Sequence, residues 1–81
     1  MIEILRVLDE TLEKMKPIAS VVGMGSVVKL ADTILAVGTS VLENYKTGSI
    51  VISSEDAAEI EIMLKRVQDE NDALHDKINA A

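Results

Sequence analysis

Apolar residues recur along the chain at spacings of three and four, which is typical of amphipathic α-helices. The first segment, residues 1–16, is predicted to form a helix over about residues 2–16. Its apolar stripe consists of Met1, Leu5, Leu8, Leu12 and Met15, and Ile2, Ile4 and Val7 widen that stripe, while charged residues occupy most of the other positions. Pro17 disfavours helical geometry at the preceding residue, so we predict that this helix ends or kinks there.

The second segment, residues 18–45, is the most apolar part of the chain. Its charges up to residue 42 are Lys29 and Asp32, which would be neighbours on a helix and could pair. Glycines predict a break near residues 23–26, with Ser26 capping a helix that runs from about residue 27 to 45. The apolar part of this segment is long enough to cross a bilayer, although charges near its middle disfavour a simple span.

Residues 46–53 are predicted to form a linker. Gly48 can supply the left-handed conformation that is common just after a helix. Residues 49–52 are rich in β-branched side chains, and they could form an extended segment that pairs with another chain. Ser53 can cap the next helix, about residues 54–79, with Ile52 as a hydrophobic staple.

This third helix carries a regular heptad stripe. Position a holds Ala57, Leu64, Asn71 and Ile78, and position d holds Ile60, Val67 and Leu74. An asparagine at position a can pair with its counterpart in a neighbouring helix, which costs stability but fixes register and favours two strands. The pattern therefore indicates a coiled coil, although packing on the chain's own helices gives the same stripe and would leave Asn71 at a solvated edge.

Length and composition favour association. The chain has 81 residues, no cysteine and a single aromatic residue, so it is predicted to be one domain, residues 1–81, with a small core. We predict an all-α fold in which two to three helices form a helical hairpin or a small bundle. Because residues 18–45 are so apolar, we expect other copies or a larger assembly to cover them. The predicted oligomer interface comprises Ile34, Gly38, Val41, Ala57, Ile60, Leu64, Val67, Asn71, Leu74 and Ile78.

The charge disfavours several classes of partner. The net charge is −6, and most of the excess lies in residues 54–81, which carry eight acidic and three basic side chains. Such a surface repels phosphate, so direct nucleic-acid binding and attraction to anionic membranes are both disfavoured.

Candidate chemistry is sparse. His75 is the sole histidine, and without cysteines it cannot complete a zinc site. The simplest interpretation is that His75 and the acidic residues Asp69, Asp72 and Asp76 are solvent-exposed. The three acidic residues could also bind a divalent cation weakly. With no recognisable nucleophile, phosphate-binding loop or room for a typical substrate pocket, we predict no enzyme, no cofactor and no small-molecule substrate.

Residues 46–81 resemble the C-terminal part of small helical proteins encoded in bacteriophage late gene clusters. The resemblance lies in the Ser53-Ser54-Glu55-Asp56 helix start and in the run from Gln68 to Leu74. It implies a virion-assembly or lysis-cassette protein without catalytic residues. Holins from such clusters are also short and apolar, but Lys29, Asp32 and the acidic C-terminal part depart from their pattern.

Three functions follow as hypotheses. The first is a non-enzymatic structural, assembly or adaptor protein that acts through helix–helix association, as a homo-oligomer or in a larger assembly, in the cytoplasm of a bacterial host or in a virion. The alternative is a small membrane-inserting, holin-like protein. A further alternative, motivated by charge alone, is an acidic inhibitor of a host protein.

Overall fold

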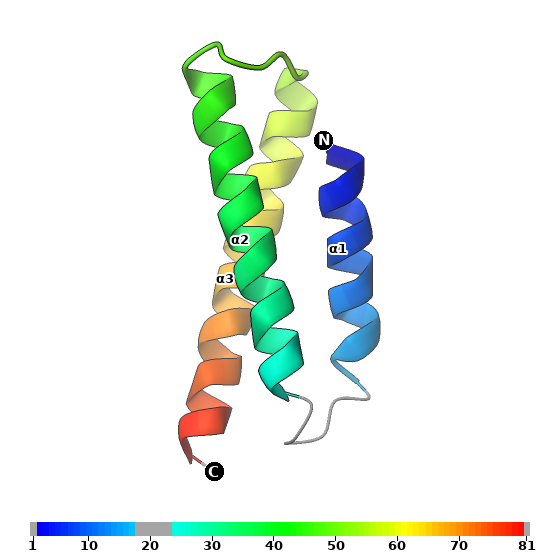
Figure 1. Ribbon diagram of the computed structural model, residues 1–81, viewed down its shortest axis with the longest axis vertical. Helices are drawn as coiled ribbons and strands as arrows, with labels where there is room; N and C mark the ends of the chain where they lie inside the picture. Colours follow the sequence, from blue (N-terminus) through cyan, green and yellow to red (C-terminus); the bar gives the residue numbers. More distant parts are fainter. Residues whose placement is uncertain (1, 18–23, 81) are drawn as a thin grey trace.

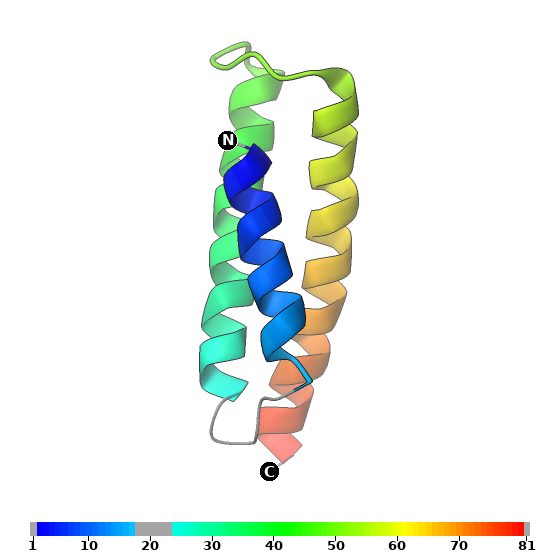
Figure 2. The same cartoon turned by 90° about the vertical axis from the view of Figure 1, so that its right-hand side faces the viewer.

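Three helices pack as a small all-α bundle in the computed structural model. The structure describes residues 2–17 and 24–80, without the side chains of residues 78 and 80. The helices are α1 (Ile2–Met15), α2 (Met24–Lys46) and α3 (Ser54–Ala80). Figure 1 shows α1 and α3 running in the same direction, with α2 antiparallel to both, and Figure 2 shows α1 lying over the groove between the other two.

The core consists of aliphatic side chains from all three helices. Its members with no exposed surface are Leu5 and Leu12 of α1, Val27, Ala31 and Ile34 of α2, and Ile60 and Val67 of α3. The most extensive contacts are between α2 and α3, whereas α1 has a smaller interface with each of them. The bundle is therefore an α2–α3 hairpin against which a shorter helix packs.

The helix ends follow sequence signals in some places and not in others. Gly48 has a φ of 79°, and the amide of Ser49 donates to the carbonyl of Asn44 at 2.8 Å, so the predicted left-handed turn after α2 is present. The hydroxyl of Ser53 accepts a hydrogen bond from the amide of Asp56 at 3.1 Å, which confirms the predicted cap. Residues 49–52 form no strand within the part of the chain that is described.

The predicted start of the second helix is wrong. Ser26 was expected to cap a helix that begins near Val27, but α2 begins at Met24 and includes both Gly25 and Ser26. A single glycine costs a helix about 1 kcal/mol relative to alanine, and the burial of Val27, Val28 and the residues after them outweighs that cost. The other part of the predicted break, residues 18–23, lies outside the described residues.

The expectation that other chains cover residues 18–45 stays a prediction, but the described part of this segment finds cover within its own chain. The large apolar side chains of α2 between residues 24 and 45 are buried or partly buried against the bundle's own core. The large hydrophobic side chains that remain exposed lie elsewhere, in α1, in the linker and in α3. Two amphipathic helices are enough to cover α2 because each contributes a full apolar stripe.

Gly38 lets α2 and α3 approach closely. A Cβ at this position would lie 2.5 Å from Cδ2 of Leu64, a separation that real Cβ atoms essentially never show, and 3.1 Å from Cγ, which is a tight contact. The side chain of Leu64 therefore occupies a notch in α2 that is open because residue 38 is glycine, and a larger residue there requires Leu64 to move. Gly38 and Leu64 were predicted to contact other chains, and here they contact each other.

This notch gives a prediction about stability. We expect Gly38→Ala to lower the free energy of unfolding by about 1 kcal/mol, because displacing Leu64 outweighs the gain in helix propensity. In a Leu64→Ala background, Gly38→Ala should instead raise the free energy of unfolding, by up to about 1 kcal/mol. Urea denaturation followed by circular dichroism measures both. Gly25→Ala, which adds a Cβ in open space, is the control and should not destabilise. Equal effects of Gly38→Ala in both backgrounds would contradict the proposed notch.

Candidate interaction surface

The residues predicted to form an oligomer interface lie mainly inside the bundle. Ile34, Gly38 and Val41 of α2 are buried, as are Ala57, Ile60, Val67 and Asn71 of α3, while Leu64 and Leu74 are partly buried. Ile78 belongs to α3, but its side chain is outside the described part. The heptad stripe thus contacts the chain's own helices, and an interface between chains through the same residues stays a prediction.

Asn71 pairs within its own chain. Its side chain is 5% exposed, and its Nδ2 donates a 2.8 Å hydrogen bond to Oδ1 of Asp32 on α2. It is therefore buried between two helices of its own chain and does not lie at a solvated edge. The spacing of Lys29 and Asp32 would allow them to pair, but among the described residues no ion pair joins these two.

The Asp32–Asn71 pair fixes the register of α2 against α3. A shift of either helix by one turn would leave the buried amide against apolar side chains, where an unpaired polar group costs about 1–3 kcal/mol. Even in the native register the Oδ1 atom of Asn71 is buried and has no hydrogen-bond partner in the described part of the chain. The pair thus stabilises one register at some cost in overall stability.

The N-terminal helix carries three adjacent stripes with different chemistry. The core stripe consists of Leu5, Leu8, Leu12 and Met15, which are buried or partly buried. The residues that follow those of the core stripe by one position form the ionic stripe, Arg6, Asp9, Glu13 and Lys16. The residues that precede them by one position form the outer stripe, Ile4, Val7, Thr11 and Lys14. Neighbouring stripes are rotated by about 100° around the helix axis, so the ionic and outer stripes flank the core stripe on opposite sides.

The ionic stripe faces α3. Nε and Nη2 of Arg6 donate to the two carboxylate oxygens of Glu59 at 2.7 and 3.1 Å, and Arg66 of α3 pairs with Asp9. Nζ of Lys16 lies 2.8 Å from Oε1 of Glu70. These pairs join α1 and α3 over their shared length, and the sequence analysis missed them. The repeated 3-4-3 spacing of charged residues beside the core stripe is the signal that could have revealed them.

These ion pairs shift several pKa values. The hydrogen bond from Arg6 lowers the pKa of Glu59 below its ordinary 4.5, against an opposing effect of desolvation. Partial burial opposes the charge on Lys16, but hydrogen bonds to Glu70 and Glu13 outweigh it and raise the pKa of Lys16. Since all of these side chains keep some contact with solvent, each pair contributes modestly to stability, and together they orient α1.

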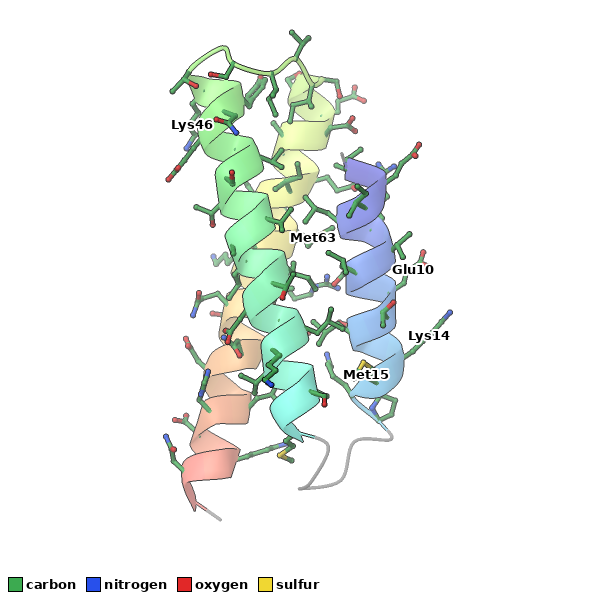
Figure 3. All side chains as sticks on the ribbon, viewed as in Figure 1. Glu10, Lys14, Met15, Lys46 and Met63 are labelled. Carbon is green, nitrogen blue, oxygen red and sulfur yellow. The ribbon has the colours of Figure 1, made fainter. Side chains whose placement is uncertain are left out.

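Met63 shows why the heptad pattern was too narrow. It lies outside the a and d positions of the stripe, yet it is 6% exposed and belongs to the core. A helix in a two-stranded coiled coil faces one neighbour, whereas α3 faces both α1 and α2 and so buries a wider surface. Figure 3 shows Met63 on the side of α3 that faces the other helices.

A cleft of about 600 Å³ lies at one end of the bundle. It opens between the end of α1, the start of α2 and the second half of α3, with Glu13, Lys16, Val27, Glu70 and Leu74 among its lining residues. Pro17 and Met24, which also line it, are the residues on either side of the undescribed segment 18–23. In its wall, Lys16 pairs with both Glu13 and Glu70, while the second carboxylate oxygen of Glu70 is buried without a hydrogen-bond partner among the described residues.

The described residues form no candidate metal site, and His75 is not part of a cluster of metal-binding side chains. They contain no group of three or more His, Asp or Glu side chains placed to hold a metal ion. His75 is exposed on α3. In the described part of the chain, the exposed large hydrophobic residues are Ile4 and Val7 of α1, Val51 of the linker and Ile62 of α3.

Comparison with known proteins finds no matching family model, no similar curated protein and no similar solved structure. The resemblance of residues 46–81 to bacteriophage late-cluster proteins therefore rests on the residues quoted for it, and it stays a prediction.

The buried amide gives a second prediction about stability. We expect Asn71→Leu to raise the free energy of unfolding by about 1 kcal/mol, because it removes a buried oxygen without a partner while Asp32 is exposed enough to bind water. Thermal and urea unfolding measure the change. Asp32→Ala is the matched control, and it should destabilise because it leaves the amide of Asn71 buried and unpaired. A less stable Asn71→Leu variant would contradict the inference.

The Arg6–Glu59 pair gives a prediction about pH. The pKa of Glu59 is lower in the folded than in the unfolded chain. Its contribution to folding stability is therefore complete above the pKa of the unfolded chain, about 4.5, and is lost as the pH falls through the pKa of the folded chain. We therefore expect Glu59→Gln to lose less stability than the wild type on acidification from pH 6 to pH 3. Urea midpoints across this range measure the slope, and parallel curves would contradict the pairing. Glu61→Gln, an exposed position on the same helix, should follow the wild type.

Proposed function

We propose that this chain is a non-enzymatic structural, assembly or adaptor protein that acts through helix–helix association, as a homo-oligomer or as part of a larger assembly such as a virion. The observation that carries the proposal is the outer stripe of α1. Ile4 and Val7 lie one turn apart, are 57% and 61% exposed, and line a shallow hollow with Glu3 and Leu8. An apolar strip on a helix in a small acidic protein is suited to binding a second helix.

The rest of the bundle supports the same reading. Its apolar interior is closed by its own helices, and the Asp32–Asn71 pair and the Gly38 notch fix the α2–α3 hairpin in one register. A rigid hairpin with a third helix on its side presents a defined helical surface. The sequence contains no recognisable group of catalytic residues, so we assign the chain no catalytic role.

Membrane insertion is the second candidate function. Among the described residues, α2 is the one helix that is long and apolar enough to cross a membrane, by its length and composition. The core helix of a protein that stays in water has the same properties. In the bundle Asp32 of α2 is held by Asn71, and inserting α2 alone would break that hydrogen bond and place Lys29 and Asp32 in the bilayer.

The two candidates are separated by the mass and the location of the chain. We expect sedimentation equilibrium in detergent-free buffer, at micromolar concentrations, to give a mass above that of the 8.8 kDa monomer. A stable monomer would overturn self-association as the function. Fractionation of expressing bacteria tests the alternative, and recovery in the membrane fraction after a carbonate wash would favour insertion instead.

A further inference from the structure

We propose that the outer stripe of α1 is the contact between two copies of this chain, and that the two α1 helices pack antiparallel about a two-fold axis. The inference rests on the proposed function and adds to it the surface, the occupant and the orientation. It depends on three observations about the stripe: its spacing, its chemistry and the distribution of charge along it.

The spacing of the outer stripe is that of a helix–helix seam. Ile4, Val7, Thr11 and Lys14 follow one another at three, four and three residues, as do the members of the core and ionic stripes. The core stripe packs into the bundle and the ionic stripe faces α3. The outer stripe has the same geometry on the opposite flank, where its apolar members are exposed.

Three of the four positions on the stripe present apolar surface. Ile4 and Val7 do so directly. The hydroxyl of Thr11 donates to the carbonyl of Val7 at 2.9 Å, so its hydrogen-bonding need is met inside the helix and its methyl group is left for packing. Lys14 points away from the bundle, as Figure 3 shows, and its long aliphatic stem can cover an apolar neighbour while its ammonium group stays in water.

The net charge of −6 makes a second copy a poor partner for most of this surface. The α1 segment is the exception, because residues 1–16 carry four acidic and three basic side chains, close to balance. By contrast, Ile62 lies on the strongly acidic α3, and Val51 stands alone in the linker. Another copy is therefore repelled least at the outer stripe.

The charges along α1 select the antiparallel arrangement. Glu3 lies beside the start of the stripe and Lys14 forms its end. In an antiparallel pair each Lys14 lies over Ile4 of the other copy with its ammonium group next to Glu3, and Val7 packs against Thr11. In a parallel pair, Lys14 would face Lys14 and Glu3 would face Glu3, which is unfavourable. An isologous two-fold contact of this kind closes at the dimer.

A stripe of four positions on one short helix is a small interface, so we expect a weak dimer whose population depends on concentration. Sedimentation velocity over a wide concentration range measures its dissociation constant. Val7→Glu should abolish the dimer, because it places two like charges near the centre of the contact. Ile62→Glu introduces the same charge at an exposed apolar site on α3 and should leave the mass unchanged. Far-UV circular dichroism checks that each variant keeps its helices.

Charge exchange tests the orientation. We expect Lys14→Glu to raise the dissociation constant at least about tenfold, since it replaces two attractive pairs with two repulsive ones. Glu3→Lys should have a similar effect, and the double variant Glu3→Lys with Lys14→Glu should return to within about threefold of the wild type.

Each failure has a different meaning. If Val7→Glu dissociates the dimer but neither charge change alters its dissociation constant, the antiparallel arrangement is overturned. If Val7→Glu also leaves the dissociation constant unchanged, the outer stripe is overturned as the contact, while the proposed self-association stands. A wild-type chain that remains monomeric at every concentration would overturn both this contact and self-association as the function.

Discussion

The burial of one strongly apolar helix by two amphipathic ones is the constraint on which this structure depends. The large apolar side chains of α2 are covered by the stripe of α3 on one side and by the core stripe of α1 on the other. Close contact between α2 and α3 is achieved where Leu64 fills the notch above Gly38. An 81-residue chain without disulfides has little stability to spare, so this contact area decides whether the bundle forms.

Polar interactions then determine which bundle forms. Apolar stripes alone allow α2 and α3 to slide past each other by one turn, and the Asp32–Asn71 hydrogen bond makes one register preferable to the others. The ionic stripe does the same for α1, because its Arg6, Asp9 and Lys16 meet partners on α3 in one relative position. Specificity in this protein comes from a few polar contacts around an aliphatic core.

Local signals in the sequence were the most reliable guide. The Pro17 stop, the Gly48 turn and the Ser53 cap each act over a few residues, and the helices end close to where these residues place them. Contacts between residues distant in the sequence could not be predicted in this way. The stripe of α3 is the same whether it faces its own chain or another, and nothing near Asn71 in the sequence indicates that Asp32 will be its partner. Likewise, the break expected at Gly25 and Ser26 did not account for the burial available to the helix that contains them.

The parallel orientation of α1 and α3 has an electrostatic consequence. Each helix has a dipole whose positive end is its N-terminus, and here two positive ends lie at the same side of the bundle, where Arg6 adds a further positive charge. Glu3 lies in the first turn of α1, and Glu55, Asp56 and Glu59 lie in the first two turns of α3. Acidic residues of the chain thus offset the repulsion between these parallel dipoles, which gives part of the excess negative charge a role in folding.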